Sequence, residues 1–342
     1  MASDVIHSDM VIIGAGPVGL FAVFEAGLLG MNCHVIDNLD KIGGQCAELY
    51  PEKPIFDIPA LPYCTGQELI DRLKKQAEPF DPVYHLDQQA ETLSRVGRDA
   101  WRLTTSDGLI FETPNIVVAA GAGSFVPRRV PLANAHEFEG QSLHYAVRQR
   151  DTLAGKDIVI AGGGDSALDW LINLAEIANS ITLVHRRDDF RAAPDSVAQM
   201  RALLSDGKAR LMIGQIASIT GDNGETSSVE VKTKTGNETI KCNTLLAFFG
   251  LKAELGPLAD WGLNVERNHI DVETVGFETN QPGIFAIGDI ATYPGKLKLI
   301  LSGFHEAALM CQRAYARAYP EKKLVFRYTT SSASLHEKLG IK

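Results

Sequence analysis

Hydrophobic and polar positions near the start of the chain follow the pattern of a strand, a turn and a helix. Residues 10–13 (MVII) form an apolar run, which indicates a buried strand. A glycine-rich turn follows at residues 14–19 (GAGPVG), and residues 20–29 form an apolar helical stretch. Residues 33–37 (CHVID) predict a second strand. These segments together predict a β-α-β unit with its glycines between strand and helix.

A second segment with the same pattern lies far downstream. It comprises a strand at 158–161, a glycine turn at 162–167 (GGGDSA), a helix at 168–178 and a strand at 181–184. Gly14 and Asp37 are 23 residues apart, and so are Gly162 and His185. One glycine turn is weak evidence because such turns are common. Two at equal spacing favour two dinucleotide sites over two tight turns in a generic α/β sheet.

The other segments indicate that the second unit is inserted into the domain that contains the first. They are a helix at 66–78, antiparallel strands within 92–112 and 217–241, and apolar strands at 116–120, 245–249 and 284–287. We therefore expect an α/β protein in which residues 1–116 and 288–342 form one domain and residues 117–287 form the inserted one.

Composition limits the classes of partner. The 342 residues are 45% hydrophobic and 22% charged, which suits two globular domains. With 33 basic and 42 acidic residues the net charge is -9, which argues against nucleic acid as the main partner. The chain's five cysteines form no C-x-x-C pair, and neither cysteines nor histidines show metal-ligand spacing, so we predict no metal.

The location that we expect is the cytoplasm. Scattered cysteines favour a reducing compartment. Residues 1–10 lack the basic and apolar run of a signal peptide, and no apolar stretch comes near the roughly 18 residues that a membrane helix needs. We therefore expect a soluble protein that does not bind a membrane.

The first glycine turn has the chemistry of a pyrophosphate site. Gly14, Gly16 and Gly19 would let the backbone approach an anion at the helix N-terminus, where free N–H groups and the helix dipole favour negative charge. Asp37 ends the second strand, where a carboxylate accepts hydrogen bonds from a ribose diol. It would repel a 2′-phosphate, so the site should hold FAD or NAD and not NADP. The alternative is a solvated acid at a strand end.

The second turn carries the opposite charge at the equivalent place. His185 takes the position of the aspartate and is followed by Arg186, Arg187 and Arg191. Guanidinium groups offer fixed donor pairs that match phosphate oxygens, so we interpret this site as selective for NADP. The alternative is a solvated basic cluster that is paired with neighbouring aspartates.

Five segments in this order resemble the thioredoxin-reductase-type flavoproteins. They are residues 14–19 (GAGPVG), 43–45 (GGQ), 162–167 (GGGDSA), 185–188 (HRRD) and 288–289 (GD). The resemblance covers nearly the whole chain. It is closest to the ferredoxin–NADP⁺ reductases of the thioredoxin-reductase-like type, through the following segments: 49–53 (LYPEK), 143–145 (LHY), 169–170 (DW) and the Ser/Thr-rich tail at 329–334.

Two cysteine pairs that related branches use are missing. Thioredoxin reductases carry a C-x-x-C pair shortly before the second glycine turn, but residues 142–156 contain no cysteine. The glutathione-reductase branch has two cysteines five residues apart, and here Cys46 is present while Pro51 takes the second place. Disulfide exchange needs both thiols in one site, so neither relay operates. We interpret Cys46 as a small buried residue.

The resemblance implies a homodimeric FAD enzyme with two Rossmann-like domains, the NADP(H) domain inserted into the FAD domain. It would transfer a hydride between NADP(H) and FAD, and single electrons between FAD and ferredoxin or flavodoxin. A flavin performs both kinds of transfer, so no side-chain acid or base is required. Two alternatives stay open. One is an NADPH-dependent reductase of a quinone or other small acceptor, and the other is a flavin and NADPH sensor without turnover.

The same resemblance implies roles for individual residues. Tyr50 would stack on one face of the flavin ring, while Tyr328, from a C-terminal extension that covers the flavin, would lie on the other. The alternatives are a core aromatic for Tyr50 and a tail residue on a subunit surface for Tyr328. Other implied FAD contacts are Gln45, the backbone at Ala90, Phe125, Asp289 and Thr330. Implied NADP(H) contacts are Gly162, Gly164, Asp165, Ser166, Ala167, His185, Arg186, Arg187 and Arg191.

Docking of an acidic ferredoxin on this acidic chain requires a local basic rim. The candidates are Arg128, Arg129, Arg148, Arg150, Lys296 and Lys298. The alternative is that these charges only keep the surface solvated.

Overall fold

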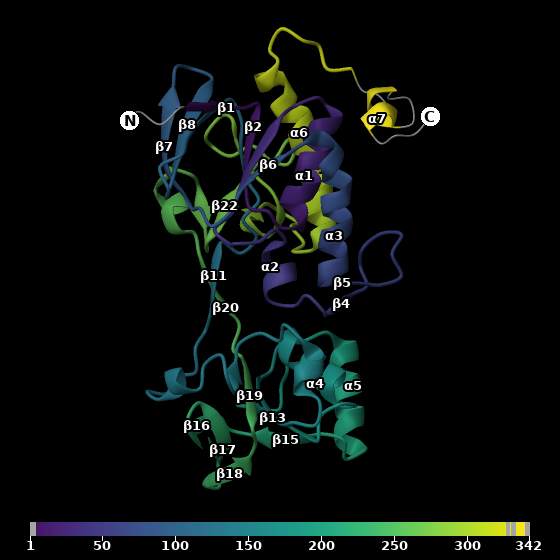
Figure 1. The fold of residues 1–342 in the computed structure, drawn as a ribbon, viewed down its shortest axis with the longest axis vertical. Helices are drawn as coiled ribbons and strands as arrows, with labels where there is room; N and C mark the ends of the chain where they lie inside the picture. The colour runs from purple at the N-terminus through teal and green to yellow at the C-terminus, as the bar shows by residue number, and fades with distance from the viewer. Residues whose placement is uncertain (1–4, 326–328, 330–332, 339–342) are drawn as a thin grey trace. The chain divides into compact units, whose positions relative to one another are not determined.

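A computed structural model describes residues 5–325, 329 and 333–338 of the chain (Figure 1). It divides into two compact units, the first made of Met1–Ser124 and Ala253–Lys342 and the second of Phe125–Lys252. Strands β11 (Ser124–Pro127) and β20 (Leu251–Glu254) pair with each other where the chain passes between the units. The second unit is therefore inserted between two parts of the first.

The unit boundaries differ from the crossovers that we predicted near residues 117 and 288. Residues 117–124 and 253–287 belong to the first unit. The physical reason is packing: Val118, Trp261, Ile270 and Phe285 are all buried in the hydrophobic core of the first unit. A strand pattern shows that a segment is buried but does not show in which core.

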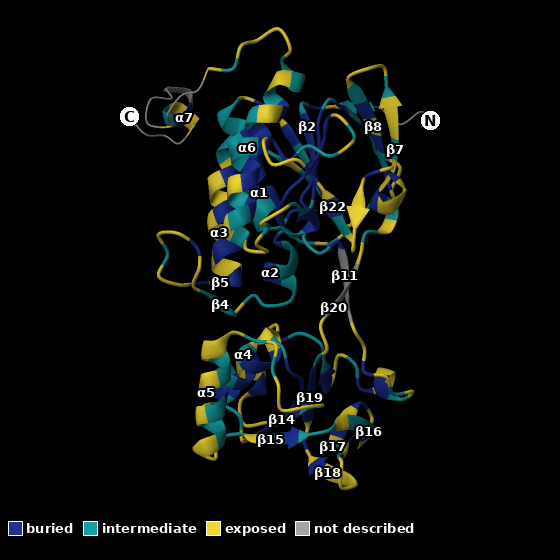
Figure 2. Cartoon of the chain, turned by 180° about the vertical axis from the view of Figure 1, so that it is seen from behind, coloured by how far each residue is buried: buried dark blue, intermediate teal, exposed yellow. Residues whose placement is uncertain are grey.

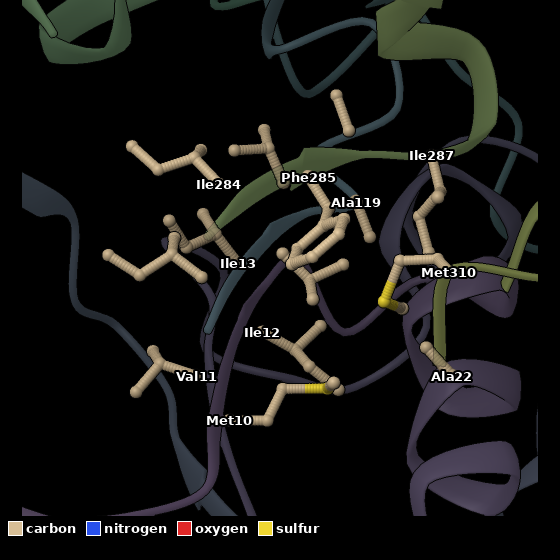
Figure 3. Packing of buried hydrophobic residues seen from close by; sticks show 14 of the residues in the cluster. Met10, Val11, Ile12, Ile13, Ala22, Ala119, Ile284, Phe285, Ile287 and Met310 are labelled. Carbon is tan, nitrogen blue, oxygen red and sulfur yellow. The ribbon is translucent and has the colours of Figure 1, made fainter. Parts of the chain in front are cut away.

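A parallel five-stranded sheet lies at the centre of the first unit. Its strands, in order, are β23 (Ile284–Ala286), β10 (Ile116–Val118), β2 (Met10–Ile13), β3 (Cys33–Ile36) and β6 (Val83–His85). All four residues of β2 are buried, as the uninterrupted apolar run predicts for a parallel strand covered on both faces. Figure 3 shows this core, with Ile12 between Met10 and Phe285 in this view and with Met310 near Ala22.

Three long helices pack in the first unit: α1 (Pro17–Leu28), α3 (Gly66–Ala77) and α6 (Ile300–Ala318). Proline at the first position of α1 suits a helix start because its φ angle is already helical. A capping box starts α3, in which Thr65 Oγ1 accepts from the Glu68 amide at 3.1 Å and the Glu68 carboxylate accepts from the Thr65 amide at 2.8 Å. Each helix turns its buried stripe inward (Figure 2).

Smaller elements complete the first unit. They are β1 (Val5–His7), β4 (Pro54–Ile55), β5 (Cys64–Thr65), β7 (Ala90–Val96), β8 (Ala100–Thr105), β9 (Ile110–Thr113), β21 (Val265–Glu266), β22 (His269–Asp271), β24 (Ala291–Thr292), α2 (Gly44–Glu48) and α7 (Ala333–Lys338). Strands β7, β8 and β9 are antiparallel, as the alternating pattern predicts.

The second unit repeats the same plan. Its parallel sheet has, in order, β12 (Leu143–His144), β19 (Thr244–Phe248), β13 (Asp157–Gly162), β14 (Ser180–His185) and β15 (Arg210–Ile213). Two helices and an antiparallel sheet accompany it: α4 (Asp165–Leu174), α5 (Pro194–Ser205), β16 (Gln215–Asp222), β17 (Glu225–Lys232) and β18 (Asn237–Lys241). In both units a β-α-β segment places a glycine turn between a central strand and a helix.

No helix within the described part of the chain is both long enough and apolar enough to span a membrane.

Two histidines on neighbouring strands form a coupled pair in the first sheet. His34 of β3 and His85 of β6 have rings stacked 5.2 Å apart, and His34 Nδ1 lies 2.9 Å from His85 Nε2. Burial lowers the pKa of both rings, and the proximity of His85 lowers the pKa of His34 further. The backbone carbonyl of His85 accepts a hydrogen bond from the Asp37 amide at 3.0 Å. Contacts of the His34 and His85 rings, and of the His85 carbonyl with the Asp37 amide, therefore join the edge strand β6 to the end of β3.

This pair predicts an acid-sensitive stability. A histidine whose pKa is depressed by folding favours the neutral form in the folded state. Its contribution to the free energy of unfolding is therefore complete above the unfolded pKa of about 6.5 and is lost as the pH falls through the folded pKa. We expect the melting temperature to fall below about pH 6.5, and to fall less in His34→Gln, which removes one charge of the pair. The measurement is thermal unfolding between pH 5 and 8. His136→Gln, at an exposed position, is the control. The same dependence of melting temperature on pH in both variants would contradict the prediction.

Candidate functional site

The first glycine turn, residues 14–19, brings backbone into very close contact. Gly14 has φ +110°, and a Cβ atom there would lie 2.4 Å from the carbonyl oxygen of Ala119, which follows β10. A Cβ atom on Gly19 would lie 1.9 Å from the carbonyl oxygen of Gly14. Glycine at these two positions is required for the turn itself and for packing of α1 on the sheet.

Gly16 is different because the chain leaves space beside it. Its φ of −75° suits any residue, and a Cβ atom would meet only the Cα of Gly44, at 3.9 Å. Gly16 is also the N-cap of α1 and makes no side-chain capping bond. Packing within the chain does not require glycine here, whereas close approach of a bound group does. The open turn and the uncapped helix start fit a dinucleotide pyrophosphate.

Asp37 lies beside this turn and is tied to it. Its Oδ2 accepts a hydrogen bond from the Ala15 amide at 2.6 Å, and its Oδ1 accepts from the Leu39 amide at 2.9 Å. The Gln88 amide donates to the Asp37 carbonyl at 3.0 Å, which brings in the segment that leads to Ala90. Burial raises the pKa of the carboxyl group, and the two amide bonds counteract this. Each carboxylate oxygen has a second lone pair that is free for a hydroxyl donor.

The next segment adds an amide and an aromatic ring. Helix α2 begins at Gly44 beside Gly16, and the Gln45 side chain reaches Gly121, where a Cβ atom would lie 3.3 Å from Gln45 Nε2. Tyr50 follows α2, with its hydroxyl 3.7 Å from Cys46 Sγ. Burial raises the pKa of Cys46 to about 11, so this thiol is protonated at neutral pH and is a poor nucleophile.

Asp289 comes from the segment that follows β23, the strand at the edge of the sheet opposite β6. It lies in the single turn η5 (Gly288–Ile290), which follows β23. Burial raises the pKa of Asp289, and the charges of Lys296 and Lys298 lower it. Helix α6 packs closely on α1 here: a Cβ atom on Gly303 would lie only 2.3 Å from Val18 Cγ2. The start of α1, the turn η5 and the first turns of α6 therefore converge.

Three predicted FAD contacts are not placed by side chain. Tyr328 and Thr330 lie outside the described residues. Phe125 is in β11, where only the backbone is described.

The second glycine turn, residues 162–167, reproduces the first. A Cβ atom on Gly162 would lie 2.6 Å from the Phe248 carbonyl oxygen. Gly164 has φ −105°, is the N-cap of α4 without a side-chain capping bond, and would meet only the Arg191 carbonyl oxygen, at 3.6 Å. Ala167 is fully buried where the first turn has Gly19. The middle glycine is again the one with open space.

His185 packs on this turn. A Cβ atom on Gly163 would lie 2.3 Å from the His185 ring, and the ring centroid of Phe190 is 5.3 Å from that of His185. Burial lowers the pKa of His185, with the charges of Arg186 and Arg187 acting in the same direction. The ring is therefore neutral at pH 7 and covers the glycine backbone.

The basic segment after β14 is joined to the turn through its backbone. The Arg191 amide donates to the Gly163 carbonyl at 2.8 Å, and Asp165 Oδ1 accepts from the Ala193 amide at 2.9 Å. Ser166 is exposed at the start of α4.

The arginines of this segment fall into two groups. Arg187 pairs with Asp189 at 3.3 Å, and Arg201 of α5 pairs with Asp188. Arg186 and Arg191 are exposed and have no acidic partner within the described ranges. Of the predicted cluster, these two guanidinium groups are the ones available to an anion.

The structure corrects part of the predicted docking rim. The Lys296 side chain is only 6% exposed and pairs with Glu306, which is fully buried, so its ammonium group cannot meet a partner. Arg129 is exposed but already paired with Glu139 at 3.1 Å. Sequence reasoning missed Glu306, although a signal was present: it lies three residues after Gly303 and one before Ala307, on the buried stripe of α6.

No group of three or more His, Cys, Asp or Glu side chains among the described residues is arranged to hold a metal ion.

The fold and the paired turns define a protein with two Rossmann-type dinucleotide units. A family model described as pyridine nucleotide-disulphide oxidoreductase matches residues 8–310, and the chain belongs to this family. The ferredoxin–NADP reductase of Rhodopseudomonas palustris (strain BisB18) is 57% identical over 340 residues, 99% of each chain. That of Parvibaculum lavamentivorans (strain DS-1) is 56% identical over 342 residues, 100% of both chains.

Solved structures show the same fold. The thioredoxin reductase of Lactococcus lactis superposes with a TM-score of 0.77 at 25% identity, covering 92% of this chain and 99% of that one. The predicted fold class and family resemblance are thus confirmed.

The close contact at Gly19 predicts a large loss of stability in Gly19→Ala. The added methyl group must push the Gly14 carbonyl aside, so we expect the free energy of unfolding to drop by about 3 kcal/mol. Urea unfolding of the flavin-free protein measures this. Gly16→Ala is the matched control on the same turn and should cost under about 1 kcal/mol. Equal costs for the two variants would contradict the distinction between the two glycines.

Proposed function

We propose that this protein is a ferredoxin–NADP reductase that holds FAD at the first glycine turn and NADP(H) at the second. The observation that carries the proposal is that each turn has one glycine, Gly16 or Gly164, beside which the chain leaves open space at an uncapped helix start. The curated relatives that match the chain over its full length carry that activity in their names.

On the FAD side, Gly16 and the amino end of α1 would receive the pyrophosphate, and Asp37 would accept hydrogen bonds from the adenosine ribose. Further contacts that we propose are the backbone at Ala90, the side chains of Gln45, Tyr50 and Asp289, and the residues Phe125, Tyr328 and Thr330. Tyr50 would stack on the ring, with Tyr328 on the other face.

On the NADP(H) side, Gly162, Gly164 and the amino end of α4 would receive the pyrophosphate. Arg186 and Arg191 would bind the 2′-phosphate, because they lack acidic partners in the described structure. Asp165, Ser166, Ala167, His185 and Arg187 complete the proposed contacts, His185 and Asp165 by fixing the turn and the segment that follows β14.

Bound FAD would supply a two-electron acceptor that also passes electrons one at a time to an iron–sulfur partner. The protein's own residues bind and orient the two nucleotides and keep water away from the ring. Burial keeps Cys46 protonated beside Tyr50, so the thiol does not serve as a relay.

We further propose a cytoplasmic homodimer whose electron partner is ferredoxin or flavodoxin. The five cysteines, all free and buried, suit a reducing compartment. Phe56 and Tyr63, 70% and 63% exposed, supply apolar surface for a subunit contact.

The experiment is anaerobic mixing of the purified flavoprotein with NADPH and then with oxidised ferredoxin. We expect the yellow flavin absorbance to bleach on the first addition and to return on the second. Bleaching that ferredoxin does not reverse would reject ferredoxin and redirect the search to quinones. A flavin that stays oxidised with bound NADPH would favour a sensor and contradict the reductase.

The two arginines without an acidic partner in the described structure, Arg186 and Arg191, predict a preference for NADPH over NADH. Replacing Arg186 and Arg191 together by alanine removes charge-assisted bonds to a 2′-phosphate, so we expect the KM for NADPH to rise by about 100-fold and that for NADH to change little. Steady-state kinetics with both nucleotides measure the ratio. Arg210→Ala, which removes an exposed pair with Glu238 in the same unit, is the control. An unchanged preference in the double variant would exclude these arginines from recognition.

A further inference from the structure

Glu306 is a fully buried carboxylate with an unusually complete set of partners. Its Oε2 accepts a hydrogen bond from the backbone amide of Gly288 at 2.6 Å. Its Oε1 accepts from the Tyr293 hydroxyl at 2.7 Å and also pairs with the Lys296 ammonium group. A carboxylate without exposed surface is costly unless it is paired and hydrogen-bonded, so this arrangement holds only while all three partners remain in place.

The contact with Gly288 has a structural consequence for Asp289. Ile287 follows β23 and its amide still bonds to Val118 of the sheet. Gly288, with φ +76°, begins the turn η5 at the next position, and its amide bonds to Glu306 instead of the sheet. Glu306 supplies the acceptor for this amide from the second turn of α6. The bond therefore fixes the direction in which the chain leaves the sheet, and with it the position of Asp289.

We propose that Glu306 is a positioning residue for FAD, acting through the Gly288 amide to hold Asp289 toward the cofactor. The inference rests on the proposed function, which places Asp289 at the FAD site. Lys296 and Tyr293 have a supporting role: they pair with and hydrogen-bond to Oε1, so that Oε2 stays directed at the Gly288 amide.

The charges that act on the Asp289 carboxyl group come from several segments of the chain, and they separate a buried side of the turn from an exposed side. Lys296, Lys298, Glu306 and His269 all act on the Asp289 carboxyl group. Lys298 also contacts His269 of β22, with Nζ 2.6 Å from Nε2. Glu306 pairs with Lys296, so Lys298 remains as the exposed cationic side of the turn, and the buried side is an internal pair.

A second glutamate at the opposite end of β23 provides a matched comparison. Glu278 Oε1 accepts from the Gly283 amide at 2.8 Å, and its Oε2 pairs with Arg313 of α6 at 3.2 Å. Like Glu306, this glutamate accepts from the amide of a glycine at one end of β23 and pairs with a cationic side chain. Gly283 precedes β23, whereas Gly288 follows it, next to Asp289. Only the contact at Gly288 should matter for the cofactor.

The experiment compares two neutral double variants of the full-length protein. E306Q/K296M removes both buried charges but keeps an oxygen acceptor for the Gly288 amide. E306L/K296M removes the charges and the acceptor. E278L/R313M removes the matched contact at the other end of β23. For each protein we would measure thermal unfolding of the flavin-free form, and FAD affinity by the change in flavin fluorescence on titration.

We expect E306Q/K296M to bind FAD within about threefold of the wild type, and E306L/K296M to bind it about tenfold more weakly or worse, since an unsatisfied amide displaces the turn. E278L/R313M should lose thermal stability and keep its FAD affinity. D289N should weaken FAD binding to a similar degree as E306L/K296M, and adding D289N to that variant should cause little further loss because both act on one contact.

Three outcomes would overturn the inference. Equal FAD affinity in E306Q/K296M and E306L/K296M would show that the Gly288 bond does not position the cofactor. Additive losses from D289N and E306L/K296M would show that Glu306 does not act through Asp289. In both cases FAD binding by the wild type leaves the proposed function standing. A wild-type chain that binds no FAD would overturn the proposed function and the inference together.

Discussion

Contact between backbone atoms at the two glycine turns is the constraint on which the rest of the structure depends. At Gly14 and Gly19 the ends of β2 and β10 and the start of α1 lie so close that no side chain fits between them. Gly162 has the same role in the second unit, against Phe248. Because the turn is this tight, each helix begins directly above the carboxyl ends of its strands, with free amides directed outward. The open middle glycine then leaves access to those amides.

Residues far apart in sequence meet at the first turn because the sheet brings their strand ends together. Asp37 arrives from β3, Gln45 from α2 and Asp289 from the turn after β23. Two backbone amides hold the Asp37 carboxylate, and packing of Gly288 and Gly303 against Val18 holds the turn that carries Asp289, so both lie in defined positions before any ligand binds. The buried carboxylate of Glu306 extends this scaffold to the last of the three.

The sequence predicts what depends on local pattern. Strand β2 matches its predicted limits, because an apolar run is a local signal. Each glycine turn lies between a strand and a helix as predicted, but α1 and α4 begin at Pro17 and Asp165, inside the predicted turns. The first unit resumes at residue 253, ahead of the predicted boundary near residue 288, because burial of residues 253–287 does not show which core they join. Pairing of the basic cluster with neighbouring aspartates was an alternative that the sequence offered, and Arg187 follows it. The contacts of Glu306 with Lys296 and Gly288 could not be predicted, because they are set by the fold.

The central claim is that one open glycine in each turn marks one nucleotide site, and calorimetric titration of Gly16→Ala and Gly164→Ala with FAD and with NADP⁺ tests it most directly. Both positions have φ angles that alanine adopts, so both variants should fold. The account predicts that Gly16→Ala loses about tenfold or more in FAD affinity and keeps NADP⁺ binding, while Gly164→Ala shows the reverse. Wild-type affinity of both variants for both nucleotides would contradict it.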